Sequence, residues 1–209
     1  MKINWQSNMQ DQSKTSRQQK AELEILLFEC PEDWAVWLDK NHAMSAGLWL
    51  RFAKKAAQLH SMSHAQALEL ALCYGWIDGQ KNTYDSESWI QKFTPRGSKS
   101  IWSKINQESA TMLIQNGKMQ PAGLREVERA KADGRWDVAY DSVRQAKVPS
   151  DFQLELDNNP AANDFFATLN SRNRYAILFR IQTAKKAETR AKRIHHFIAM
   201  LEKQEKIYP

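Results

Sequence analysis

Apolar and polar residues follow short, regular periods between about residue 23 and residue 95. Residues 47–53 alternate between apolar and polar side chains, which is typical of a half-buried strand. Residues 31–41 instead repeat tryptophan and leucine at the spacing of one helix face, after a proline that suits a first helical turn. By the same reasoning, the first half should contain strands at 23–28, 47–53, 77–84 and 88–93, and helices at 31–41 and 63–74.

The pattern changes after Pro95, because every later segment has helical features. Ser, Asn-Pro and Pro stand where helices begin, and Asn-Gly and Asp-Gly stand where they end. Apolar residues of the last helix fall on one stripe, the spacing of a surface that faces a core. Ser103, Ser150 and Ser171 are expected to be the N-caps of helices, and Pro121 and Pro160 to open two others. The last helix should span 186–203, with a long connection at 140–149.

These elements predict an α+β fold, with a small antiparallel sheet and two helices in the N-terminal half and an all-helical C-terminal half. Residues 1–22 are polar and lack a period, so we expect a loose tail there. An α+β subdomain is then expected at 23–95 and a helical subdomain at 96–209. With 209 residues, of which 42% are hydrophobic, the chain can bury a substantial core.

The amino-terminal residues lack the apolar stretch and cleavage site of an export signal, and no segment has the roughly 18 apolar residues of a membrane span. We therefore expect a cytoplasmic protein without a membrane span. Cys30 and Cys73 form no Cys-x-x-Cys pair and lie in apolar contexts, so they are predicted to be reduced, small core residues.

The net charge of +6 is concentrated in two segments. Residues 92–104 contain four bases and no acid. Residues 171–193 contain eight bases and one acid, which are Arg172, Arg174, Arg180, Lys185, Lys186, Arg190, Lys192, Arg193 and Glu188. Two helices meeting near residues 183–186 would gather this charge at one corner. Such patches favour an anionic partner, although runs of charge also occur on merely solvated faces.

The stretches 72–80 and 88–106 contain the densest set of candidate residues, with three tryptophans, one acid and four bases. Acids are depleted in strands, so Asp78 stands out. It could hold Arg96 or Lys81 in place, which we favour, or act as an acid/base if desolvated. The neighbouring glycines have a structural explanation, since Gly75 can end a helix and Gly79 can form a bulge or tight turn.

Residues 93–104 are suited to bind an anion. Glycine and serine amides precede a helix start and are flanked by Arg96, Lys99 and Lys104. Trp89, Phe93 and Trp102 could add stacking faces, as in sites for single-stranded nucleic acid. Equally, this could be a solvated loop whose tryptophans join the two halves. The segment is not a phosphate-binding Walker loop, since that glycine and lysine spacing is absent.

No catalytic or metal-binding pattern is present. The five histidines form no His-Glu-x-x-His motif, and the sequence contains no Gly-x-Ser-x-Gly motif. His60 and His64 are four residues apart, but a loop separates them, so they should not share a helix face. We predict no metal and no cofactor.

Several motifs resemble the YdeI/OmpD-associated, or bacteriocin-protection, family. They are the segments 71–80, 93–96, 102–106, 132–137, 173–176 and 189–193, and the resemblance spans about residues 23–209. It implies a link to tolerance of antimicrobial peptides and carries over no reaction or catalytic residues. Members are described as periplasmic, which would require an export signal that this sequence does not show.

The leading hypothesis is a non-enzymatic stress or antimicrobial-peptide tolerance protein that binds an anionic ligand: nucleic acid, a phosphorylated metabolite or an acidic protein. One alternative is an enzyme acting on a small anionic substrate, with Asp78 as acid/base, and another is a structural or partner-docking protein. The oligomeric state is left open. The predicted ligand-binding residues are Trp76, Asp78, Gln80, Arg96, Lys99, Trp102, Lys104, Asn106, Arg174, Arg190 and Arg193.

Overall fold

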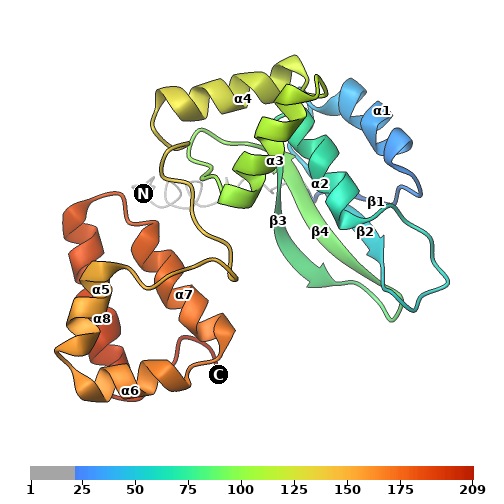
Figure 1. The fold of residues 1–209 in the computed structure, drawn as a ribbon. Coiled ribbons are helices and arrows are strands. Elements are labelled where there is room, and N and C mark those ends of the chain that lie inside the picture. The colour runs from blue at the N-terminus through green and yellow to red at the C-terminus, as the bar shows by residue number, and fades with distance from the viewer. Residues whose placement is uncertain (1–21) are drawn as a thin grey trace, which may run out of the picture.

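The structure is a computed structural model and describes residues 22–209, so the predicted tail at 1–22 lies outside the described residues except for Glu22. Figure 1 shows a half built on a sheet and a half built of helices, joined by a linker. The elements of the first half are β1 (Ile25–Leu26), α1 (Pro31–Asn41), β2 (Leu48–Ala53), α2 (His64–Cys73), β3 (Trp76–Thr83), β4 (Ser88–Pro95), α3 (Lys104–Gln115) and α4 (Pro121–Ala132).

The sheet has four strands in the order β1-β2-β4-β3. β4 pairs antiparallel with both β2 and β3, which confirms the predicted hairpin of β3 and β4. β1 pairs parallel with β2, so the prediction of a purely antiparallel sheet is wrong. The reason is connectivity, because α1 returns the chain between β1 and β2 and so allows both strands to run in the same direction.

α2 begins and ends as its local sequence predicts. Ser63 and Gln66 form a capping box, and Gly75 follows the helix with φ of 74°. A Cβ atom at Gly75 would lie 2.9 Å from the carbonyl oxygen of Ala122, at the start of α4. Glycine therefore serves both the turn and the close approach of α4.

The helices α3 and α4 pack on the sheet half. Leu72 and Cys73 of α2 share a buried cluster with Trp102, Leu113 and Val127, which lie on or beside α3 and α4. A second cluster lies between the sheet and the helices α1 and α2, around Trp34, Phe52 and Phe93. The subdomain limits 23–95 and 96–209 stay a prediction, although the packing divides after residue 140.

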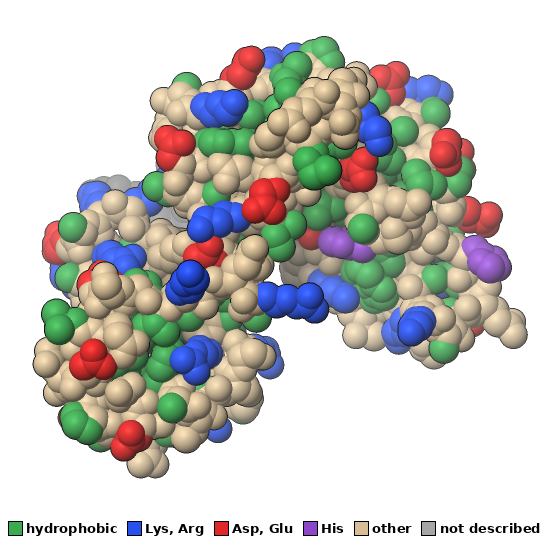
Figure 2. All heavy atoms as spheres, viewed as in Figure 1, with side chains coloured by type: hydrophobic (Ala, Val, Ile, Leu, Met, Phe, Trp, Pro, Cys, Tyr) green, Lys and Arg blue, Asp and Glu red, His purple; other side chains and the backbone are tan. Residues whose placement is uncertain are grey.

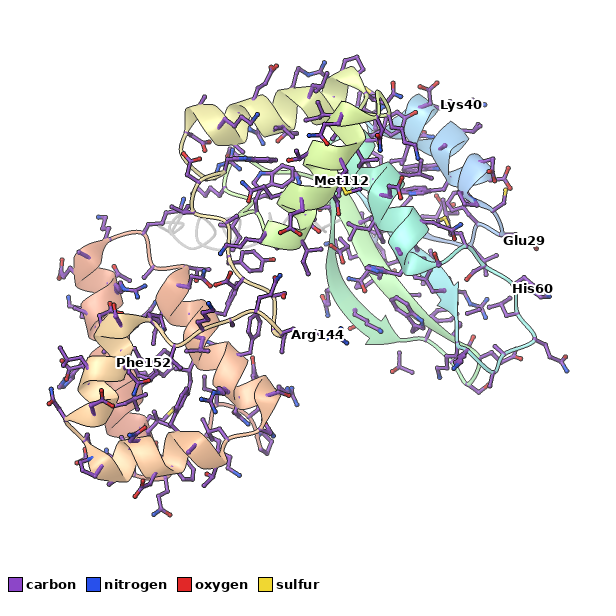
Figure 3. The ribbon with its side chains drawn as sticks, in the orientation of Figure 1. Glu29, Lys40, His60, Met112, Arg144 and Phe152 are labelled. Carbon is purple, nitrogen blue, oxygen red and sulfur yellow. The ribbon has the colours of Figure 1, made fainter. Side chains whose placement is uncertain are left out.

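The second half is all helical, as predicted, with a buried core that includes Phe152 (Figure 3). Two predicted N-caps are wrong by one residue. Pro149 rather than Ser150 is the N-cap of the first helix and makes no side-chain cap, and Asn170 rather than Ser171 caps the third. The helices are α5 (Ser150–Asp157), α6 (Pro160–Thr168), α7 (Ser171–Gln182) and α8 (Ala187–Glu202).

Across the described part of the chain, none of the helices combines the length and the apolar character needed to traverse a bilayer.

Candidate functional site

The structure separates the candidate residues of the sheet half. Trp76 is 1% exposed, and its indole N–H donates to the carbonyl of His42 over 3.1 Å. Gln80 is exposed on β3 and bonds to Asn82. Trp76 is thus part of the core, and Gln80 lies on the surface.

Asp78 contacts neither Arg96 nor Lys81 directly, so our favoured explanation for this acid is wrong. Its Oδ2 atom lies 3.0 Å from Nε2 of His64 and accepts a hydrogen bond of 3.1 Å from Gln91. This polar group lies at one edge of the aromatic cluster of the sheet half, where His64 contacts the rings of Phe52, Trp89 and Phe93.

Arg96 is buried, although the sequence placed it in a loop. It is 4% exposed, and its guanidinium carbon lies 3.5 Å from the ring centroid of Trp102, which is 2% exposed. Burial lowers the pKa of Arg96 to about 10, so the side chain is still charged at neutral pH. Arg96 Nε and Nη2 and Trp102 Nε1 lack hydrogen-bond partners, whereas Arg96 Nη1 donates to the carbonyl of Ile101 over 3.4 Å and the guanidinium stacks on the Trp102 ring.

The remaining candidates near this loop differ in exposure. Lys99 is exposed. Lys104 makes an ion pair of 2.6 Å with Asp141 of the linker. Asn106 is 9% exposed, and its backbone N–H donates to the hydroxyl of Ser103 at the start of α3. The ammonium group of Lys104 is therefore already paired within the protein.

The three arginines predicted in the helical half also have intramolecular partners. Arg174 lies over the ring of Phe166, with its guanidinium carbon 4.6 Å from the centroid. Arg190 binds both carboxylate oxygens of Asp151, at 2.6 and 2.8 Å. Arg193 donates to the carbonyl of Arg180. Nucleic acid or another anion would have to compete with these contacts.

A different set of residues forms a cavity of about 590 Å³, within the usual size range of ligand pockets. It lies along α7, between the linker and the C-terminal segment, and contains no acid. We call it the α7 pocket, and its lining consists of Val143, Ser171, Arg172, Tyr175, Ala176, Phe179, Arg180 and Tyr208. In Figure 2, Lys and Arg side chains gather on the border of the helical half with the sheet half.

Two arginines of the α7 pocket converge on the ring of Tyr208. The guanidinium carbons of Arg172 and Arg180 lie 4.3 and 6.0 Å from its centroid. The guanidinium of Arg180 beside the phenol, assisted by that of Arg172, lowers the pKa of Tyr208. The same positive charge would stabilise an anion bound there.

Asn173 holds the C-terminal segment against α7. Its side chain donates from Nδ2 to the carbonyl of Tyr208 over 3.1 Å and accepts from the N–H of Tyr208 over 2.9 Å. Asn173 is 1% exposed, so these bonds are shielded from water. The position of the Tyr208 ring is thus fixed through its backbone.

Sequence reasoning counted Arg172 and Arg180 in the basic segment but did not select them as site residues, and it missed the aromatic walls. Arg172, Tyr175 and Phe179 are spaced i, i+3 and i+7, so one face of a helix that begins near 171 carries them together. That signal is visible in the sequence. The contribution of Tyr208 is not, because it depends on a contact between distant residues.

A second cavity, of about 380 Å³, lies between α5 and α8. Asp151 and Glu155 line it together with Arg190, so its acids offset its basic charge. Among residues 22–209, no three His, Cys, Asp or Glu side chains are grouped so that they could hold a metal ion. The α7 pocket is therefore the better candidate for an anion.

Two family models match the chain. Residues 26–126 match a domain of unknown function, DUF8412, and residues 145–204 match the family described as Bacteriocin-protection, YdeI or OmpD-Associated. No curated protein and no solved structure is significantly similar to the chain. The predicted family is confirmed, over a shorter stretch than the residues 23–209 that we expected. Residues 145–204, which contain α7, therefore match a domain of the YdeI/OmpD-associated, bacteriocin-protection family.

Proposed function

We propose that this is a non-enzymatic binding protein that holds a small anionic ligand in the α7 pocket. The observation that supports this most is the convergence of Arg172 and Arg180 on one ring, in a cavity whose lining contains no acid. A role in stress or antimicrobial-peptide tolerance is proposed from the family resemblance, and the cytoplasm stays the proposed compartment.

The chemistry of the lining favours an anion over a neutral ligand. Guanidinium groups donate two parallel hydrogen bonds to phosphate or carboxylate, and they lose little hydration when they do so. Apolar walls beside them exclude water and strengthen the attraction. Repulsion between the two arginines is relieved when an anion binds between them.

The proposed site lies away from the loop at residues 95–104. Arg96 is stacked on Trp102, and Lys104 is paired with Asp141. Arg172 and Arg180 instead line an open cavity and lie against the ring of Tyr208, and Nη1 of Arg180 also donates to the carbonyl of Ala176 over 2.9 Å. The ligand is therefore expected to bind to the helical half rather than to the sheet half.

Titration calorimetry with pyrophosphate tests this proposal. The double variant Arg172→Gln with Arg180→Gln should bind pyrophosphate at least about 100-fold more weakly, since each lost charged hydrogen bond costs about 1.5–3 kcal/mol. The matched control is Lys55→Gln with Lys185→Gln, which removes the same charge from two exposed positions outside both cavities.

Equal loss of binding in the control would mean that net charge alone attracts the anion. Unchanged binding in the arginine variant, or no binding of pyrophosphate at millimolar concentration, would contradict an anion site in the α7 pocket. Circular dichroism of each variant checks that the fold is retained.

One observation favours the enzymatic alternative. The contact of 3.0 Å between His64 and Asp78 joins an imidazole to a carboxylate, and both side chains are partly exposed, at 32% and 23%. A carboxylate that orients an imidazole is a common arrangement for general acid/base chemistry. Since Arg96 and Lys104 are engaged elsewhere, the predicted clamp for the substrate would have to come from other residues.

A further inference from the structure

We infer that the anion bound in the α7 pocket is part of a nucleotide, with the phosphate at the arginines and a planar base against the aromatic wall. This inference rests on the proposed function and specifies its ligand. It depends on the shape and chemistry of the wall rather than on charge alone.

Three aromatic side chains form most of the apolar wall. Tyr175 and Phe179 lie on successive turns of α7 with their ring centroids 5.8 Å apart, and Tyr208 lies on the C-terminal segment. Tyr140 of the linker packs edge-on against Phe179, with centroids 5.0 Å apart, and supports it from behind. A flat base can stack on such rings, whereas a sugar phosphate or a bare anion leaves them uncovered.

The wall is held rigidly, which suits stacking. The hydroxyl of Tyr175 donates to the carbonyl of Asp141 over 3.0 Å, and Asn173 fixes the backbone of Tyr208. A preorganised wall loses little conformational freedom when a ligand binds. A base that binds there would therefore meet a wall that these hydrogen bonds already hold in place.

The arginines define where the phosphate lies. Arg172 and Arg180 are eight residues apart on α7, so their Cα atoms are separated by about 12 Å along the helix axis, yet both side chains reach the same ring. A phosphate between them would lie near the hydroxyl edge of Tyr208. The base would then extend over Tyr175 and Phe179, which lie between the two arginines in sequence.

The test compares AMP, ribose 5-phosphate and adenosine by titration calorimetry on the full-length protein. AMP should bind at least about tenfold more tightly than either of the other two, because only AMP carries both the base and the phosphate. Phe179→Leu should weaken AMP severalfold and leave ribose 5-phosphate unchanged. Tyr208→Leu should also weaken AMP, but it removes the ring against which both arginines lie, so it should weaken ribose 5-phosphate too. The arginine double variant should weaken both phosphates and leave adenosine unchanged.

Tyr84→Leu provides a matched control, since Tyr84 is also aromatic and 48% exposed but lies outside the α7 pocket. If ribose 5-phosphate binds as tightly as AMP, or if neither aromatic variant weakens AMP, the nucleotide inference fails while the anion site stands. If none of the phosphates binds, both fail. Two aromatic variants are used because Phe179 also packs on Tyr140, whereas Tyr208 is held by its backbone.

Discussion

At the scale of single residues, most of the basic side chains perform structural work. Arg190 links α8 to α5 through the carboxylate of Asp151 and also donates to the carbonyl of Ile181 over 2.9 Å. This arginine lowers the pKa of Asp151. Part of the positive charge of residues 171–193 is thus paired within the protein and stabilises the helical half.

The ion pair of Arg190 and Asp151 predicts how the stability of the protein depends on pH. A carboxyl with a lower pKa in the folded chain than its ordinary 3.8 stabilises the fold above that value, and the contribution is lost as the pH falls through the folded pKa. Arg190→Gln should therefore be less stable than the wild type at about pH 6, and the gap should narrow below about pH 4. Since Asp151 is 46% exposed, the pH-dependent part should be under about 1 kcal/mol.

Urea unfolding of Arg190→Gln, Asp151→Asn and the double variant at several pH values measures the coupling. The bond of Arg190 to Ile181 leaves a gap that does not depend on pH. If the difference in free energy of unfolding between the wild type and Arg190→Gln stays constant from about pH 6 to pH 2.5, Asp151 contributes nothing to that difference.

At the scale of elements, the contact between α2 and α4 fixes how the helices cover the sheet half. A Cβ atom at Gly123 of α4 would lie 2.3 Å from the carbonyl oxygen of Cys73 and 2.8 Å from that of Leu72. Both neighbours are backbone atoms at the end of α2, so they cannot move aside without shifting the helix. Gly123 is therefore needed for space rather than for backbone freedom.

Gly123→Ala should destabilise the protein by about 1–3 kcal/mol, because α4 must move away from α2. The matched control is Gly97→Ala, where the nearest atom to a new Cβ would be 3.8 Å away. Guanidinium unfolding monitored by tryptophan fluorescence compares the two variants. Equal effects in both would mean that the change is not caused by the contact with α2.

Local signals in the sequence predicted most elements and few of the contacts between them. The capping box at Ser63 and the glycine at 75 act within a few residues, so both could be predicted and both are present. The cap at 170 was missed by one residue because Asn170 and Ser171 are both favourable cap residues. The cap at 149 was missed because Pro149 occupies it without a side-chain hydrogen bond, which leaves no cap signal in the sequence. The pairing of Asn173 with Tyr208 spans 35 residues and leaves no local pattern.

At the scale of the whole molecule, Asp141 joins the two halves. Its Oδ1 atom pairs with Lys104 of α3 at 2.6 Å, and its Oδ2 atom accepts from Gln182 of α7 at 3.1 Å. The two family models also meet around this linker, because one ends at 126 and the other starts at 145. Figure 3 labels Arg144 in the same linker, next in sequence to Val143, which lines the α7 pocket.

Asp141→Ala should loosen the two halves while changing the overall free energy of unfolding by less than about 1 kcal/mol, since Lys104 is 48% exposed. We expect a larger radius of gyration in X-ray scattering and faster proteolysis within residues 142–149. Asp137→Ala, at an exposed position just before the linker, is the control. Identical scattering and proteolysis of the two variants would contradict a role for Asp141 in joining the halves.

The way Asn173 holds Tyr208 has a consequence for engineering. Both bonds go to the main chain, so the path of the C-terminal segment does not depend on which side chain occupies position 208. The location of this wall and its chemical character are therefore encoded by different residues. Substitutions at 208 should change the chemistry of the proposed site without rebuilding the scaffold, which makes this position a starting point for directed evolution.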